Sequence, residues 1–331
     1  MAQVHRLMPG AEFAGRYRVD AVIGQGTMGA VYRVREKAGG EVRALKVMKA
    51  DLLTDDPKFP ARFEQEARIS ERIKSPQVVT VFDSGVDAAT GLPWLAMELL
   101  EGRTLDAYLA EAPRPPPEVA RDLLDQLFAG AAAAHAANVV HRDLKPENVF
   151  LVGEPGAFVV KILDFGIAKV VRESTLAGTT PGLGTPLWTA PEQTREGQVI
   201  RPAADVWALG LLTFRLLTGK AYWRAANDPK SSAFDVAVEL VRAPLVAASE
   251  RARELGVEDA LPPGFDAWFA RAVVRDPDAR FANAAEAHAA LAPLVDARRG
   301  GRSGARTLVI AAAVALVVAL ALALARAIFH S

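Results

Sequence analysis

The chain has 331 residues, which is enough for two lobes that each bury a sizeable core. Its 39 Lys and Arg residues balance its 39 Asp and Glu residues, so no overall positive field favours nucleic acid as a partner. The absence of cysteine excludes disulfides, thiolate catalysis and cysteine-based metal centres.

The first hundred residues alternate apolar and polar side chains in several short runs. The alternation predicts strands over 17–24, 29–36 and 41–49, and two more over 78–85 and 93–100. We expect these runs to form a small sheet.

One helix is predicted inside this region, over residues 59–74. Helical spacing places four residues on one face: Phe63, Ala67, Ser70 and Ile73. Glu66 lies among them, and a carboxylate on an apolar face needs a partner.

Helices dominate the chain after residue 104. Residues 113–136 open with prolines suited to a helix start. Residues 202–219 are nearly all apolar, which predicts a buried helix that stops at Gly219. A further helix and its exit are expected within 263–281.

The C-terminal region carries a long apolar run. Residues 308–325 are all uncharged and apolar, and with Thr307 they would span about 28 Å as a helix. Four arginines lie in or next to the Gly- and Arg-rich stretch 294–306, whereas Arg326 alone follows the run. The sequence therefore predicts a juxtamembrane linker over 294–306, a single transmembrane helix over 307–329, a short external tail at 330–331, and a cytoplasmic N-terminal part.

The stretch "IGQGTMGAV" at 23–31 fits the pattern G-x-G-x-x-G-x-V. In a dinucleotide-binding fold a helix would follow it, but "AVYRV" continues with strand-like alternation. The pattern therefore favours a glycine hairpin over phosphates, and a plain tight hairpin is the alternative.

Two charged residues among the first hundred have apolar surroundings that do not suit either charge alone. Lys46 has apolar neighbours in its predicted strand, and Glu66 lies on an apolar helix face. Opposite charges on adjacent elements can form a buried pair, so we expect Lys46 and Glu66 to contact each other.

The segment "VVHRDLKPENVFLV" at 139–152 places many charged groups between two apolar runs. A core strand cannot hold these groups without partners, and a solvated turn needs no apolar flanks. The segment indicates a preorganised site for a charged ligand.

With "HRDLKPEN" at 141–148, "DFG" at 164–166 and "APE" at 190–192, the sequence resembles the eukaryotic-like serine/threonine protein kinases of bacteria, specifically the membrane-anchored ones. The resemblance implies an α+β, two-lobed protein-kinase fold, with a small antiparallel β lobe that carries one helix and a larger helical lobe. It covers residues 13–293, with the small lobe at 13–98 and the large lobe at 102–293, after an N-terminal extension at 1–12.

The resemblance implies an ATP site and assigns roles to residues of this chain. Catalytic roles would fall to Asp143, Lys145, Lys46, Glu66 and Thr185. ATP would be bound by Gly24, Gln25, Gly26, Thr27, Met28, Gly29, Val31, Ala44, Lys46, Met97, Glu98, Leu100 and Phe150. Asn148 and Asp164 would hold Mg²⁺, or Mn²⁺ in its place. Structural roles would fall to Arg142, Glu192, Asp205 and Arg280.

The resemblance also implies the reaction and its regulation. Lys145 and the "GTP" at 184–186 are typical of transfer to serine or threonine of protein substrates. Autophosphorylation is expected on Thr175, Thr179 or Thr180, with Arg142 pairing the new phosphate and a homodimer as its setting. The partners expected are protein substrates and the lipid bilayer of the cell inner membrane.

Three alternatives differ in testable ways. A pseudokinase scaffold would lack at least one of Lys46, Asp143, Asn148 and Asp164, and all four are present. A small-molecule phosphotransferase does not need "APE" and a long activation segment. An oxidoreductase would bind NAD(P) without phosphate transfer.

Overall fold

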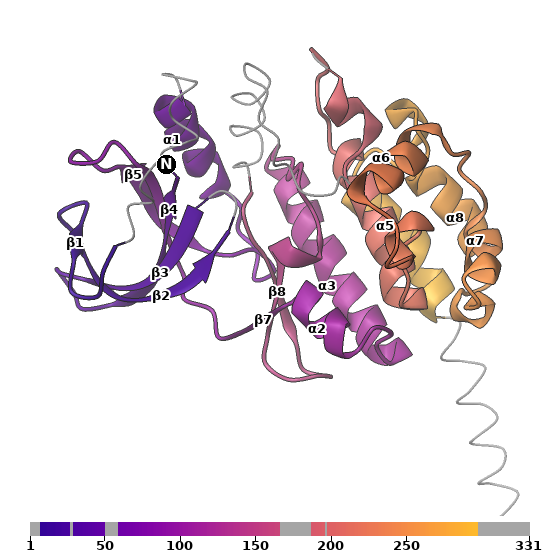
Figure 1. Cartoon of the computed structure of the whole chain (residues 1–331), viewed down its shortest axis with the longest axis horizontal. Helices are drawn as coiled ribbons and strands as arrows, with labels where there is room; N and C mark the ends of the chain where they lie inside the picture. Colours follow the sequence, from indigo (N-terminus) through magenta and orange to yellow (C-terminus); the bar gives the residue numbers. More distant parts are fainter. Residues whose placement is uncertain (1–6, 27–28, 50–58, 166–186, 196, 297–331) are drawn as a thin grey trace, which may run out of the picture.

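A computed structural model describes residues 7–26, 29–49, 59–165, 187–195 and 197–296. A lobe built on a six-stranded sheet lies beside a larger lobe built mainly of helices (Figure 1). The two-lobed α+β arrangement predicted from the motifs is confirmed.

The large sheet is antiparallel throughout and has the strand order β1-β2-β3-β4-β6-β5. Its strands are β1 (Glu12–Phe13), β2 (Tyr17–Gln25), β3 (Gly29–Glu36), β4 (Val42–Met48), β5 (Val81–Val86) and β6 (Pro93–Met97). Alternation directs one set of side chains into a small core that includes Tyr17, Tyr32, Leu45 and Trp94. The strands expected from alternation are therefore confirmed, and β1 is an addition.

Residues before the expected start of the small lobe also pack on this sheet. The Gly10 N–H donates to the Val19 carbonyl, the Leu7 N–H donates to the Tyr32 hydroxyl, and Leu7 contacts the small core. Residues 7–12 of the expected extension are thus part of the lobe.

Helix α1 (Phe59–Ser70) packs against β5, with Phe63 and Ala67 buried. It ends four residues before the predicted boundary at residue 74. Ile73 is still buried, in the core of the large lobe.

The large lobe surrounds α5 (Ala203–Thr218), in which every residue except Arg215 is buried. The other helices are α2 (Leu105–Glu111), α3 (Pro117–Ala136), α6 (Ala233–Arg242), α7 (Ala248–Glu254), α8 (Phe265–Ala272) and a helical segment over 284–296. Single 3-10 turns are η2 (Pro146–Asn148), η3 (Pro191–Thr194), η4 (Ala225–Asn227), η5 (Glu258–Ala260) and η6 (Pro277–Ala279). Gly219 ends α5 with φ of 75°, which confirms the predicted stop.

A second sheet, not predicted as such, has the order β7-β8-β9 and lies beside α2 and α3 (Figure 1). Its strands are β7 (Gly102–Thr104), β8 (Val149–Val152) and β9 (Val159–Ile162). Strand β8 starts directly after Asn148, and β9 ends shortly before Asp164. This sheet therefore brings two segments of the predicted site together.

Among the helices of the described residues, none is both long and apolar enough to cross a membrane. The predicted transmembrane helix at 307–329 and the tail at 330–331 lie outside the described part of the chain.

Candidate active site

The glycine turn connects β2 to β3, as strand followed by strand. Gly24 and Gln25 end β2, Gly29 begins β3, and the Gly26 N–H donates to the Gly29 carbonyl at 2.9 Å. The hairpin reading is thereby confirmed, and the strand–turn–helix geometry of a dinucleotide-binding fold is excluded.

The glycines of this turn have different steric surroundings. A Cβ on Gly29 would lie 2.2 Å from the Val47 carbonyl oxygen, whereas a Cβ on Gly26 would meet nothing within 4 Å. Gly29 is needed for the close approach of β4, and Gly26 leaves its backbone accessible. Thr27 and Met28 lie outside the described residues.

Strand register places the expected nucleotide-facing residues in two rows on one face of the sheet. Val31 is opposite Lys46, and Lys46 is opposite Leu95, across β3, β4 and β6. Ala44 is opposite Met97 in the next row. Directly paired residues point to the same side of a sheet, so these residues share one face. Lys46 on this face contacts Asp164, so the face is turned toward the large lobe.

Lys46 is buried, with 7% of its surface exposed, and its Nζ lies 2.7 Å from Asp164 Oδ1. The expected partner was Glu66, and the structure corrects this expectation because Lys46 pairs with Asp164 instead. Glu66 is 9% exposed on α1 and makes contacts of its own. The carboxylate that pairs with Lys46 thus belongs to the opposite lobe.

Asp143 forms the centre of the charged loop. The Asn148 side-chain amide donates to the Asp143 carbonyl at 2.7 Å and to its Oδ2 at 3.0 Å. Lys145 Nζ lies 2.9 Å from the same Oδ2. Three residues expected to share one site are therefore in direct contact, and η2 holds Asn148 in place.

Asp205 holds the backbone of the charged loop through hydrogen bonds. Its Oδ2 accepts the His141 N–H at 2.8 Å, and its Oδ1 accepts the Arg142 N–H at 2.9 Å. Burial alone would raise the pKa of Asp205, but hydrogen bonds and favourable charge interactions with His135 and His141 outweigh it and lower that pKa. Asp205 therefore contacts the backbone of the charged loop, at the place where the expected bracing role requires it.

His135 is a site residue that the sequence analysis missed. Its Nε2 lies 2.9 Å from Asp205 Oδ2, and its Nδ1 accepts the Ala284 N–H at 3.1 Å. These bonds assign the proton to Nε2. His135 follows buried Ala131 by four residues on α3, so its position on the apolar face was the available signal.

His141 connects the charged loop to the segment that carries Asp164. Its Nδ1 accepts the Asp143 N–H at 3.2 Å, and its Nε2 donates to the Leu163 carbonyl at 2.7 Å. Its ring meets Phe165 edge-on, with centroids 4.6 Å apart. The loop and the Asp164 segment are therefore positioned together.

Backbone strain marks the same two segments. Arg142 has φ of 69° and Asp164 has φ of 61°, in the left-handed region that non-glycine residues seldom occupy. The Arg142 carbonyl accepts a 2.7 Å hydrogen bond from the Gln193 side chain, which ties the loop to η3. Gln193 is a second residue that the sequence analysis missed.

The connection between the lobes begins at Glu98. Its N–H donates to the Thr80 carbonyl, and its Oε1 accepts the Thr80 N–H at 2.7 Å and lies 2.7 Å from Lys161 Nζ. Its carbonyl is therefore the backbone group expected to meet an adenine edge, together with a group of Leu100. Phe150 on β8 is paired with Thr104 on β7, and its side chain is expected to pack beneath the adenine base.

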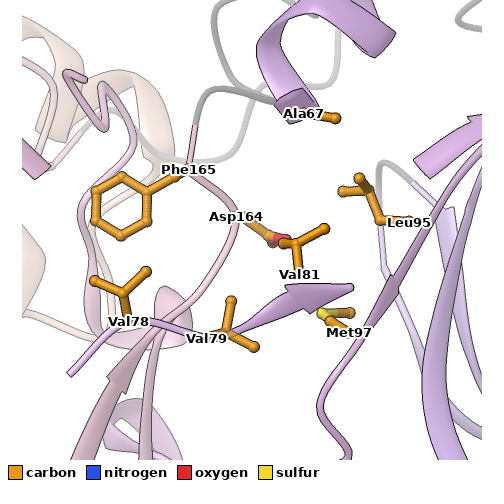
Figure 2. Close-up of a pocket in the computed structure, with 8 residues that line it drawn as sticks. All are labelled: Ala67, Val78, Val79, Val81, Leu95, Met97, Asp164 and Phe165. Atoms are coloured by element: carbon orange, nitrogen blue, oxygen red, sulfur yellow. The ribbon is translucent and has the colours of Figure 1, made fainter. Parts of the chain in front are cut away.

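A small cavity lies behind Met97, where both lobes contribute side chains (Figure 2). Its lining residues are Ala67, Val78, Val79, Val81, Leu95, Met97, Asp164 and Phe165. Phe165 and Val78 lie together at one end, away from Met97 (Figure 2). Met97 thus forms part of the wall between this cavity and the face that carries Ala44.

The donor set fits a hard divalent cation that shares its ligands with phosphate. Asp164 offers a carboxylate, and Asn148 keeps its amide oxygen because its nitrogen is already used as a donor. No group of three or more acidic, histidine or cysteine side chains forms a metal cage within the described residues. This composition suits Mg²⁺, which keeps water and binds substrate phosphates.

Glu192 and Arg280 form the buried pair expected in the large lobe. Arg280 Nη1 and Nη2 lie 2.7 Å and 2.8 Å from the two oxygens of Glu192, and the side chains are 0% and 6% exposed. The pair fixes η3, which carries Gln193, against the end of α8 and the start of α5. Four further expected residues, Thr175, Thr179, Thr180 and Thr185, lie outside the described residues.

The comparisons with known proteins agree with this geometry. A family model described as the protein kinase domain matches residues 17–289. The serine/threonine-protein kinase PknL of Mycobacterium bovis is 38% identical over 269 residues, which are 81% of this chain and 63% of that protein. The serine/threonine-protein kinase pkn3 of Myxococcus xanthus is 39% identical over 219 residues, which are 63% of this chain and 39% of that protein.

The chain therefore spans less than two thirds of the length of these relatives. Among solved structures, the crystal structure of the Mycobacterium tuberculosis PknI kinase domain matches with a TM-score of 0.65 and 25% identity. The match covers 87% of this chain and 99% of that one.

Proposed function

The chain belongs to the protein kinase family, and we propose that it is an ATP-dependent serine/threonine protein kinase that acts in bacterial signalling. One observation carries the proposal. Lys46, Asp143, Lys145, Asn148 and Asp164 come from three separate segments. Ion pairs and hydrogen bonds join them into two groups, Lys46 with Asp164, and Asp143 with Lys145 and Asn148. A pseudokinase scaffold would not need this complete set.

The residues act mainly by positioning and by charge stabilisation. Lys46 binds the α- and β-phosphates of ATP, and the backbone of the glycine turn covers them. Both side-chain contacts of Asp143 use Oδ2, so Oδ1 is the oxygen that we expect to accept the proton of the substrate hydroxyl.

The transfer step is an in-line displacement. The hydroxyl oxygen of the substrate bonds to the γ-phosphorus, the bond from that phosphorus to the bridging oxygen breaks, and ADP leaves. Lys145 stabilises the negative charge on the transferred phosphoryl group. Asn148 and Asp164 would hold Mg²⁺, which neutralises phosphate charge when bound, and Mn²⁺ has the same ligand preference.

Serine or threonine as the acceptor is supported by Lys145 beside Asp143, and by the relatives named serine/threonine-protein kinases. We extend the proposal to autophosphorylation at Thr175, Thr179 or Thr180, with Arg142 as the partner of the phosphate. Mass spectrometry of active enzyme that finds no phosphate on residues 166–186 would reject this extension.

We also propose that residues 307–329 anchor the protein in the inner membrane, with the kinase domain in the cytoplasm. The support is the uncharged run 308–325 and the four arginines that precede it. The full chain should resist extraction from membranes at alkaline pH, and a chain that ends at residue 306 should be released. Equal release of both would contradict the anchor.

The activity itself is tested with the full chain, ATP labelled on the γ-phosphate, Mg²⁺ and a generic basic protein. Labelled phosphoserine or phosphothreonine should form, and Lys46→Met or Asp143→Asn should reduce the rate at least 100-fold, an expectation on the order of known positioning effects. Lys230→Met, at an exposed lysine of the large lobe, is the control. Transfer that survives both site substitutions would overturn the proposal.

A further inference from the structure

Gln193 contacts the charged loop from η3, and its side-chain amide forms a hydrogen bond at each end. Its Nε2 donates to the Arg142 carbonyl at 2.7 Å, and its Oε1 accepts the Ala190 N–H at 3.0 Å. Because a carbonyl accepts and a backbone N–H donates, these partners fix the orientation of the amide. The position therefore uses a donor and an acceptor on one side chain.

The bond from Gln193 acts on the peptide unit that precedes Asp143. The carbonyl of this unit belongs to Arg142, and its N–H belongs to Asp143 and donates to His141 Nδ1 at 3.2 Å. Because a peptide unit is planar, hydrogen bonds at its two ends fix its rotation about the chain. Gln193 and His141 together thus set the direction in which the backbone enters Asp143.

The same bond holds one side of a strained residue. Arg142 has φ of 69°, a conformation that persists where neighbouring groups hold it in place. Asp205 Oδ1 accepts the Arg142 N–H at 2.9 Å, and Gln193 holds the carbonyl on the other side. A rotation of the 142–143 peptide unit would break the bonds to Gln193 and His141 together.

The turn that presents Gln193 is itself fixed in the large lobe. Glu192, the preceding residue, forms the buried pair with Arg280 through bonds of 2.7 Å and 2.8 Å. The Gln193 N–H donates to the Ala190 carbonyl at 3.0 Å, so Gln193 and Ala190 are joined by two hydrogen bonds. The side chain therefore reaches the charged loop from a rigid base.

We propose that Gln193 is a positioning residue for Asp143, which holds the 142–143 peptide unit so that Asp143 Oδ1 faces the substrate hydroxyl. The proposal rests on the kinase function proposed above. Lys145 and Asn148 hold Oδ2 of Asp143, and Gln193 holds the backbone from which that side chain projects. Because Gln193 acts through Asp143, its loss should lower kcat and leave KM for ATP nearly unchanged.

Gln193→Met tests the two hydrogen bonds at similar side-chain length. In the full chain, assayed with labelled ATP, Mg²⁺ and a generic basic protein, kcat should fall at least roughly tenfold while KM for ATP stays within about twofold. Thr194→Ala is the matched control on η3, because the Thr194 hydroxyl donates to the Pro191 carbonyl within the same turn. It should keep both constants. A kcat of Gln193→Met equal to that of the wild type would overturn the proposal.

Gln193→Glu separates positioning from a general contribution to stability. Its carboxylate can accept the Ala190 N–H but repels the Arg142 carbonyl, whereas the protonated carboxyl can donate to that carbonyl. The ratio of the variant's kcat to the wild-type kcat should therefore rise at least about threefold as the pH is lowered from about 8 to about 5.5. A constant ratio over this range would overturn the proposal, whatever the stability of the variant.

The comparison with the wild type isolates residue 193 in the pH series. Both proteins share the ionisable groups of the neighbouring segments, which are His141, Arg142, Asp143, Glu192, Arg195 and Arg280. If the wild type transfers phosphate and both Gln193 variants behave as it does, the positioning role is wrong and the kinase function stands. If the wild type transfers no phosphate, the proposed function is wrong, and this role with it.

Discussion

Gly26 and Gly29 belong to one turn but constrain the protein for different reasons. Gly29→Ala should destabilise the fold by about 2 kcal/mol, because its Cβ would lie 2.2 Å from the Val47 carbonyl oxygen. Gly26→Ala has no protein atom within 4 Å of its Cβ, so we expect it to leave stability unchanged and to raise KM for ATP. Chemical denaturation and steady-state kinetics separate the two effects. If Gly26→Ala and Gly29→Ala lowered the free energy of unfolding equally, the result would contradict the steric difference between the two positions.

Asp205 couples the stability of the large lobe to pH. The pKa of Asp205 is lowered on folding, so the folded state favours the ionised carboxylate. This preference adds to the free energy of unfolding. The added stability is complete above the ordinary aspartate pKa of about 4 and is lost as the pH falls through the lower pKa of the folded state. Asp205→Asn should cost about 3 kcal/mol at pH 7, because three donors lose a charged acceptor. The difference in the free energy of unfolding between the wild type and Asp205→Asn should shrink when denaturation is measured at increasingly acidic pH. A difference that stays constant down to pH 2 would contradict this role.

At the scale of elements, burial of the Glu192–Arg280 pair predicts an asymmetric response to mutation. Arg280→Met leaves a buried carboxylate unpaired and should cost about 4 kcal/mol, whereas Arg280→Met combined with Glu192→Leu should recover most of the loss. The exposed pair Arg201–Asp278 is the control, and Arg201→Met should cost less than 1 kcal/mol, on the order of a surface pair. Urea denaturation of the wild type and the three variants measures these differences in the free energy of unfolding. No recovery in the double variant would contradict the explanation.

Some secondary-structure elements could be predicted from the sequence and others could not. Alternation predicted β2 and β3 closely, because buried and more exposed side chains alternate along much of each strand. Strand β4 was also predicted, although its last five residues, 44–48, are all buried. The β7-β8-β9 sheet was not predicted, since β7 has three residues and pairs with β8 nearly fifty residues later in the chain. Periodicity is a local signal and does not report such pairing. The hydrogen bonds of His135 and Gln193 were missed for the same reason, as their partners are distant in sequence.

The motifs predicted the family and the position of the site, and the matched range of 17–289 confirms the family. They did not predict the partner of Lys46, because the choice between Glu66 and Asp164 depends on how the two lobes are arranged. A motif records which residues are present, whereas the choice of partner is a property of one conformation.

At the scale of the whole molecule, contacts between described residues join the lobes both near the connection and across the site. Near the connection, Glu98 pairs with Lys161, and Val78 forms a β-bridge with Ile162. Across the site, Lys46 contacts Asp164. We assign Lys46 to ATP and Asp164 to Mg²⁺, so we expect binding of the nucleotide to separate them and to free Lys46 to contact Glu66.

The most direct test of the Mg²⁺–ATP site is the affinity for ATP, measured by calorimetry with and without Mg²⁺, in the wild type and in Asp164→Asn. We expect Mg²⁺ to tighten binding at least tenfold in the wild type and to have little effect in the variant, because Asp164 is the carboxylate assigned to the ion. If Asp164→Asn binds Mg²⁺ and ATP as tightly as the wild type does, the site assigned to this crevice is wrong.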